Sequence, residues 1–139
     1  MLAAALLLAA AAGATWWTSG PQTTEATAKA PEPGSPIVTV SVPALDGNAA
    51  IGAQIFAAKC AACHGQNAAG SHGSGPPLVH KIYEPNHHAD GAFLLAVQNG
   101  VTAHHWPFGN MPPQEGLTRG DVLAIIAYVR ALQVANGIE

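Results

Sequence analysis

The sequence predicts a small all-α domain of three to four helices, and two observations support this fold class. Between residues 45 and 139, three segments carry apolar residues at helical spacing. In the same region, no stretch alternates apolar and polar residues for long enough to indicate a β-strand. Loops rich in proline and glycine, at residues 65–77 and 101–116, separate the predicted helices.

The first predicted helix has its cap at Asp46 or Asn48, runs to about Lys59 and leads directly into a cysteine motif. Gly52 lies on its apolar side, where a missing side chain allows another backbone to approach closely. The apolar stripe consists of Ile51, Ile55 and Phe56.

Two further helices are predicted. One starts near Asp90 and ends before Gly100, and the last starts at a Thr118 cap and stops at Asn136. Asp121, three residues after Thr118, predicts a variant of the capping box. The positions expected to be buried are Phe93, Leu94 and Val97 in the first of these helices, and Val122, Ile125, Ile126, Val129 and Leu132 in the second.

The N-terminal segment predicts export. Residues 2–12 are an unbroken run of Ala and Leu with the length of the apolar core of a signal peptide. Ala12, Gly13 and Ala14 resemble a cleavage site, whereas Trp16 and Trp17 are typical of the interfacial anchor of a retained segment. We expect residues 1–17 to be an uncleaved signal-anchor that holds the chain on the periplasmic side of the inner membrane. The alternative is a cleaved signal peptide and a protein free in the periplasm.

Residues 18–44 predict a linker. They combine several prolines with Thr, Ala, Glu and Ser, a composition that cannot form a core and favours an extended, mobile chain. Within this segment, residues 37–42 alternate apolar and small polar side chains, so they are expected to lie extended against the following domain, which spans residues 45–139.

Charge and cysteine content argue against a nucleic-acid-binding protein and against a disulfide-rich one. Only 9% of the 139 residues are charged and the net charge is −3, so no basic surface for nucleic acid is expected. Both cysteines belong to one motif, which leaves none for a disulfide framework.

That motif is Cys60-Ala-Ala-Cys63-His64, and it is typical of covalent attachment of a c-type haem. The two thiols add to the haem vinyl groups as thioethers, and the following histidine is then held under the iron. Half of a zinc site is disfavoured because no further cysteine exists, and a thioredoxin-like pair because no βαβ pattern surrounds it. A disulfide in an exported protein stays open as an alternative. Because a domain of this size has a thin core, a covalent haem would also supply apolar mass at its centre.

Met111 is the only methionine besides Met1, so it is the only thioether available to an iron in the domain. It lies in a loop between Gly109 and the prolines 112 and 113. This position is poorly suited to filling a core and well suited to presenting a sulfur atom at one point.

Taken together, these motifs resemble the class I, monohaem cytochromes c over residues 47–135. The resemblance rests on Gly52 and Phe56, residues 60–64, residues 75–78, Met111-Pro112, Leu117-Thr118 and Tyr128-Val129, in that order along the chain. It implies one covalent haem c, with His64 and Met111 as axial ligands of the iron. It also implies that the Pro76 carbonyl accepts a hydrogen bond from His64, and that Gly52 and Phe56 meet Ile125 and Tyr128 where two helices cross. Trp106 is placed either to donate its indole N–H to a haem propionate or simply to pack.

The chain departs from mitochondrial cytochromes c in two respects. The domain lacks their ring of lysines, so docking on a strongly acidic partner is not expected; its basic residues are Lys59, Lys81, Arg119 and Arg130. It is also rich in histidine, and the pairs His87-His88 and His104-His105 suggest an accessory copper or zinc site. Either member of the second pair is an alternative to Met111 as iron ligand.

The sequence therefore predicts an exported, membrane-tethered cytochrome that passes single electrons between respiratory or dehydrogenase partner proteins and has no enzymatic activity of its own. Two alternatives stay open. One is a haem-based sensor or peroxidase-like protein with an open sixth position on the iron, and the other is a periplasmic copper-binding module that uses the histidines.

Overall fold

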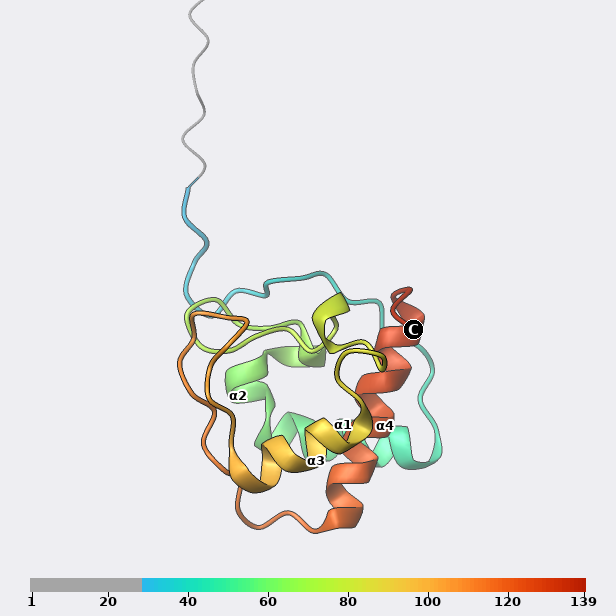
Figure 1. Cartoon of the computed structure of the whole chain (residues 1–139). Coiled ribbons are helices and arrows are strands. Elements are labelled where there is room, and N and C mark those ends of the chain that lie inside the picture. The colour runs from blue at the N-terminus through green and yellow to red at the C-terminus, as the bar shows by residue number, and fades with distance from the viewer. Residues whose placement is uncertain (1–28) are drawn as a thin grey trace, which may run out of the picture.

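The computed structural model describes residues 29–139 (Figure 1). It contains four α-helices, and the part of the chain that it describes has no strand beyond isolated bridges, which confirms the predicted all-α class. The helices are α1 (Gly47–Lys59), α2 (Ala61–His64), α3 (Asp90–Asn99) and α4 (Arg119–Ala135), with short 3-10 helices η1 (Gln66–Ala68) and η2 (Lys81–Tyr83) between them. The predicted signal-anchor at residues 1–17 and the first part of the predicted linker, to residue 28, lie outside the described residues. None of the helices described is long and apolar enough to span a membrane.

Helices α1 and α4 cross at Gly52. A Cβ atom added there would lie 1.9 Å from the carbonyl oxygen of Ala124 and 2.8 Å from the amide nitrogen of Ile125. One helical turn further along, the rings of Phe56 and Tyr128 pack with their centroids 5.5 Å apart. The contact implied by the family resemblance is therefore present, and it depends on the missing side chain at residue 52.

Helix α4 supplies most of the buried core. Thr118 and Asp121 form the predicted capping box, since each accepts a hydrogen bond from the backbone N–H of the other. This pairing satisfies two amide groups that a helix N-terminus leaves without partners. All five positions predicted to be buried in this helix are buried: Val122, Ile125, Ile126, Val129 and Leu132.

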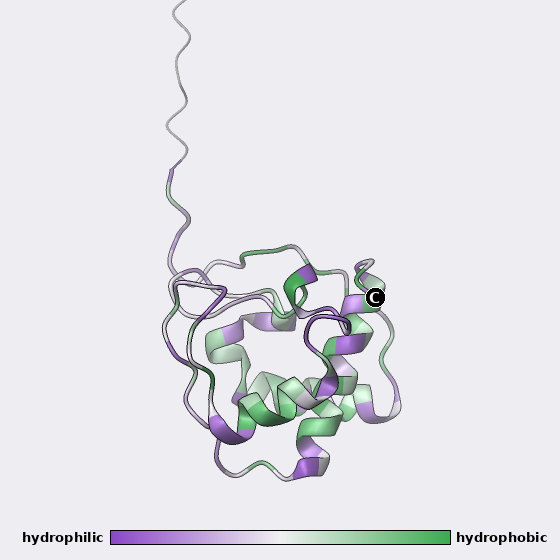
Figure 2. Ribbon diagram, viewed as in Figure 1, coloured by the Kyte–Doolittle hydropathy of each residue, from purple (hydrophilic) through white to green (hydrophobic). Residues whose placement is uncertain are grey.

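Helix α3 has the predicted bounds but not the predicted burial. Phe93, Leu94 and Val97 are only partly buried, and no residue of this helix is fully buried. Phe93 and Val97 border a cavity, and Phe93 also packs against the edge of the buried core. Figure 2 shows that α1 and α3 carry largely apolar residues around this central region.

Arg130 fixes the N-terminal end of α3 against α4. Its Nε donates to Asp90 at 2.8 Å, and its guanidinium carbon lies 4.9 Å from the centre of the Phe93 ring. Its Nη1 donates to the carbonyl of Tyr83 and its Nη2 to that of His88. The loop that leads into α3 is therefore attached to the most buried helix of the domain.

The last residues of the predicted linker are bound to the domain. Gly34 donates its N–H to the carbonyl of His72, and Ile37 and Val38 both donate to the carbonyl of Ala69. At the other end of this segment, Ser41 exchanges two hydrogen bonds of 2.9 Å with the side chain of Asn136. Residues 34–41 therefore run along the domain surface, as expected for residues 37–42, but with a bend at residues 37–38, and the bound segment starts earlier than predicted.

Candidate functional site

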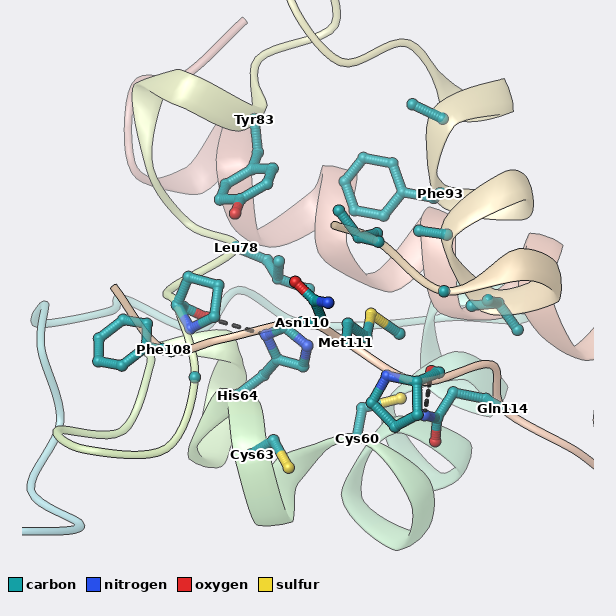
Figure 3. A pocket seen from close by; sticks show the side chains of 18 of the residues that line it. Cys60, Cys63, His64, Leu78, Tyr83, Phe93, Phe108, Asn110, Met111 and Gln114 are labelled. Atoms are coloured by element: carbon teal, nitrogen blue, oxygen red, sulfur yellow. Dashed lines mark hydrogen bonds between the residues drawn. The ribbon is translucent and has the colours of Figure 1, made fainter. Parts of the chain in front are cut away.

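A cavity of about 510 Å³ lies between α2, α3, α4 and the loops that follow α2 and α3. Its walls are mainly apolar, and Lys59 is the only lysine, arginine or acidic side chain among them within residues 29–139. Figure 3 shows the side chains that project into this space from several directions. The volume and lining are those of a binding site for a mostly apolar molecule.

The two cysteines border the cavity where α1 passes into α2. Cys60 is partly buried and Cys63 is exposed, and the two sulfur atoms are not bonded to each other. Burial, together with a smaller effect of the neighbouring Cys63, raises the pKa of the Cys60 thiol to about 11. In the chain without an attached group, Cys60 is therefore a neutral thiol at physiological pH.

His64 projects into the cavity from the end of α2, with its tautomer fixed. Its Nδ1 lies 2.9 Å from the carbonyl oxygen of Pro76, the contact drawn as a dashed line in Figure 3. A carbonyl can only accept, so Nδ1 carries the hydrogen and Nε2 keeps a free lone pair. Burial lowers the pKa of His64, and the hydrogen bond to Pro76 offsets part of this effect. The ring is therefore held neutral, in the form that binds a metal ion.

Gly75 brings Pro76 into this position. A Cβ atom added at Gly75 would lie 2.6 Å from the carbonyl oxygen of Cys63, so only glycine lets this loop pass directly against the cysteine motif. The loop is closed by hydrogen bonds between Ser71 and Gly75.

Met111 reaches the same cavity from the loop after α3. Its backbone exchanges two hydrogen bonds with Val101, of 2.9 and 3.0 Å, so the loop of residues 101–111 is closed at its base. Gly100 permits this closure: its φ is +73°, and an added Cβ atom would lie 2.5 Å from the carbonyl oxygen of Met111. Figure 3 shows the side chains of His64 and Met111 within one cavity, although 46 positions separate them in the sequence.

Trp106 also borders the cavity, and its indole nitrogen is buried without a hydrogen-bond partner among the described residues. Its ring stacks on Phe108 with centroids 6.0 Å apart and lies edge-on to His80 at 5.2 Å. Packing therefore accounts for the ring but not for the buried N–H. An unpaired buried donor costs about 1–3 kcal/mol, so this group fits a ligand that carries an acceptor such as a carboxylate.

Sequence reasoning missed Tyr83, whose hydroxyl points into the cavity in Figure 3. Burial raises the pKa of Tyr83, and a weak interaction with the Trp106 indole, which does not meet hydrogen-bond geometry, lowers it in part. The residue lies in a short 3-10 helix that the periodicity of the sequence does not reveal.

These residues fit a covalently bound haem. Two thiols, of Cys60 and Cys63, lie at one edge of an apolar cavity. The neutral imidazole of His64 and the thioether of Met111 offer two donor atoms for a metal ion. The unpaired indole N–H of Trp106 belongs to the same cavity lining. Such a donor set inside a small helical fold defines the class of c-type haem proteins.

The family comparison agrees with the geometry. The model of the cytochrome c family matches residues 49–133, which is more than half of the chain. The chain therefore belongs to the cytochrome c family and is a haem c electron-transfer protein, with Cys60 and Cys63 spaced as in the attachment motif. A search of curated proteins found no match.

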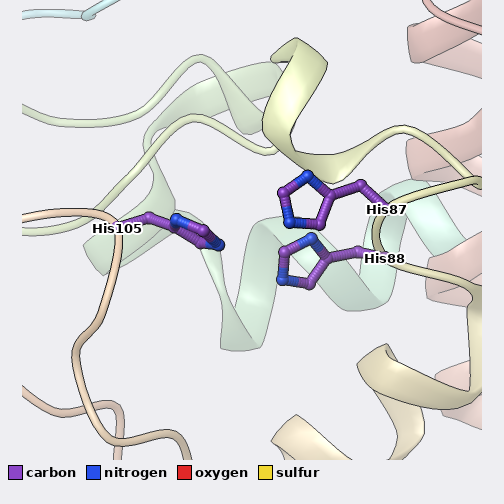
Figure 4. Close-up of side chains that lie close together, drawn as sticks. All are labelled: His87, His88 and His105. Carbon is purple, nitrogen blue, oxygen red and sulfur yellow. The ribbon is translucent and has the colours of Figure 1, made fainter.

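Three of the extra histidines lie close together outside the cysteine motif. His87 and His88, in the loop before α3, lie close to His105, in the loop after it, and one ring nitrogen of each is within 4.8 Å of the others (Figure 4). Desolvation lowers the pKa of His105, and the imidazoles of His104, His87 and His88 lower it further by repulsion of like charge. His80 instead packs on Trp106, and His72 lies in the loop that holds Gly34.

Proposed function

We propose that this protein is an exported, membrane-tethered electron carrier in which His64 and Met111 are the two axial ligands of the haem iron. The observation that carries the ligand assignment is the geometry of one cavity. Both cysteines border this cavity, and the free lone pair of His64 and the thioether of Met111 belong to its lining. The haem supplies the one-electron change between ferric and ferrous iron.

The chain itself holds and tunes the group. The hydrogen bond to Pro76 keeps His64 neutral and in one orientation, which strengthens it as a donor. The closed base of the Met111 loop limits how far the thioether can move. The buried Trp106 N–H is available to a propionate. If His64 and Met111 both hold the iron, no position would stay open for a substrate, which would favour a carrier over an enzyme.

Electron-transfer partners are expected to dock through mainly apolar contacts. Lys59 is the only lysine, arginine or acidic side chain that borders the cavity within the described part of the chain, and Leu95, another lining residue, is 58% exposed. A surface of this kind offers little for long-range attraction of an acidic or a basic partner.

Tethering is inferred from the run of Ala and Leu at residues 2–12 and the two tryptophans after it. A reporter enzyme that is active only outside the cytoplasm should be active when fused after Glu139. High-salt washing of membranes should not release the protein. Release of a chain that begins near Thr15 would instead identify a cleaved signal peptide.

The axial ligands are tested with Met111→Ala. The oxidised protein should show the weak near-infrared charge-transfer band expected for sulfur bound to ferric haem, and the variant should lose it. Because a thioether favours ferrous iron, the midpoint potential should fall, and carbon monoxide should bind the reduced variant but not the reduced wild-type protein. Leu95→Ala, a change at an exposed lining residue whose side chain offers no ligand atom, is the control and should keep the band.

An unchanged band and potential in Met111→Ala would refute the ligand assignment and favour His104 or His105. Binding of carbon monoxide to the reduced wild-type protein would instead support a sensor or peroxidase-like protein with an open sixth position.

A further inference from the structure

The histidine cluster is built by two loops that lie on either side of α3. His87 and His88 precede this helix and His105 follows it, and their ring nitrogens lie within 4.8 Å of one another. Nitrogen ligands of a tetrahedral Zn²⁺ at about 2.0–2.1 Å from the metal are separated by about 3.4 Å. His87 and His105 are exposed, so small side-chain rotations suffice to bring the three nitrogens to that spacing.

Hydrogen bonds prepare His88 as a ligand. Its Nδ1 lies 2.6 Å from the carbonyl oxygen of Ile82, so Nδ1 carries the hydrogen and the lone pair is on Nε2. Histidines that bind metal ions usually have such a partner on the other ring nitrogen, because it fixes the tautomer and the ring orientation. The backbone of His88 is held as well, by its amide to Glu84 and by its carbonyl to Arg130.

His104 has the same arrangement at the edge of the cluster. Its Nδ1 lies 2.8 Å from the carbonyl oxygen of Thr102, which leaves Nε2 free. Its ring is 4.3 Å from that of His105 and lies nearly parallel to that of His88 at 6.1 Å, measured between centroids. His104 therefore borders the cluster, outside the group of three nitrogens that lie within 4.8 Å of one another.

We propose that His87, His88 and His105 form a binding site for one divalent transition-metal ion of the Zn²⁺ or Cu²⁺ type. The donor set decides the class of metal, because imidazole nitrogen suits these ions, whereas Mg²⁺ and Ca²⁺ prefer oxygen ligands. Among residues 29–139, no carboxylate forms an ion pair with any of the three histidines, so the rings are not already engaged with an acidic partner. The site is separate from the cysteine motif and adjoins the cavity through His88 and His105.

The test uses the haem-loaded protein, freed of other metals with a chelator and titrated with Zn²⁺ in a calorimeter. One Zn²⁺ should bind per chain. His88→Gln and His105→Gln should each weaken the affinity by at least about 10–100-fold, since loss of a ligand should cost no less than loss of an outer-shell partner. His72→Gln is the matched control, because it removes a partly exposed histidine outside the cluster, and it should leave the affinity unchanged.

The haem absorption spectrum of each variant shows whether the fold and the iron ligands are intact. With that spectrum unchanged, loss of Zn²⁺ binding only in the cluster variants supports the site. Absence of saturable binding to the wild-type protein, or equal weakening by His72→Gln, would overturn the proposal. A changed haem spectrum in zinc-free His105→Gln would assign this histidine to the iron and would also overturn it.

Discussion

Substituting Gly52 with alanine tests how α1 and α4 are held together. The added methyl carbon would lie 1.9 Å from the carbonyl oxygen of Ala124, whereas real contacts of this kind are not shorter than 3.0 Å, so the helices must separate by about 1 Å. The three nearest atoms of α4 all belong to the backbone, so no rotation of a side chain can relieve the overlap. Overpacking of this type costs about 1–3 kcal/mol, and here we expect the upper end of that range.

A gain in helix propensity opposes this loss. Replacing glycine by alanine inside a helix stabilises it by about 1 kcal/mol when nothing else changes. The net expectation for Gly52→Ala is therefore a loss of about 1–2 kcal/mol in the free energy of unfolding. Gly91→Ala in α3 is the matched control, because its added methyl group would meet no atom within 4 Å and its φ is not positive. It should be neutral or slightly stabilising.

Denaturant unfolding of the haem-loaded protein, followed by helical circular dichroism, measures both variants. The two substitutions are chemically identical, so opposite signs isolate the effect of the helix crossing. If Gly52→Ala unfolded at the same or a higher denaturant concentration than the wild-type protein, close contact between α1 and α4 would not explain the need for glycine.

Three further predictions concern the helix cap, partner docking and haem attachment. Thr118→Ala should lower the stability by about 0.5–2 kcal/mol in thermal unfolding, because α4 loses its cap. The Thr118 hydroxyl and, to a smaller extent, the Thr118 backbone N–H donate to the Asp121 carboxylate and lower the pKa of Asp121. The stabilisation from this carboxylate is therefore present above its pKa in the unfolded chain and is lost as pH falls through the lower folded value. Because Thr118→Ala removes the hydroxyl donor, the acid limb of a stability–pH curve should be shallower in the variant. The rate of electron exchange with a small partner protein should change by less than about tenfold between low and high salt. Strong electrostatic steering needs many charges of one sign, whereas within the described chain only one lysine, arginine or acidic residue, Lys59, borders the cavity. Haem should stay with the polypeptide in acidified acetone, and Cys60→Ala or Cys63→Ala should sharply reduce the amount of haem-loaded protein; extraction of haem from the wild-type chain into the solvent would contradict covalent attachment.

Local signals in the sequence predicted local structure well. Thr118 and Asp121 are three residues apart, so their mutual hydrogen bonds depend on a single helical turn. Gly100 and Asn136 were also predictable as helix ends, because a C-cap likewise depends on the residues of a single turn. At Asp46 the position of the cap was correct, but its side chain makes no capping hydrogen bond.

Features that depend on distant parts of the chain needed either the family resemblance or the structure. The contact of His64 with Pro76 follows from the resemblance, because no periodicity brings a loop carbonyl to a histidine 12 residues away. Burial of Phe93 was overestimated, since an apolar stripe does not reveal whether it faces side chains or a cavity. The two histidine pairs were visible in the sequence, but only the fold around α3 brings His105 to His87 and His88.

The bound segment of residues 34–41 decides where a pull on the N-terminus would act. Gly34 and Ser35 pair with His72, and this loop continues through Gly75, which lies against the carbonyl of Cys63. A force applied along the chain would therefore reach the loop beside the haem attachment motif before it reached the start of α1. In the proposed tethered protein, the membrane anchor would thus hold the domain by the side that carries the cysteines, and this attachment point would restrict which faces of the domain can turn toward a partner in the same membrane.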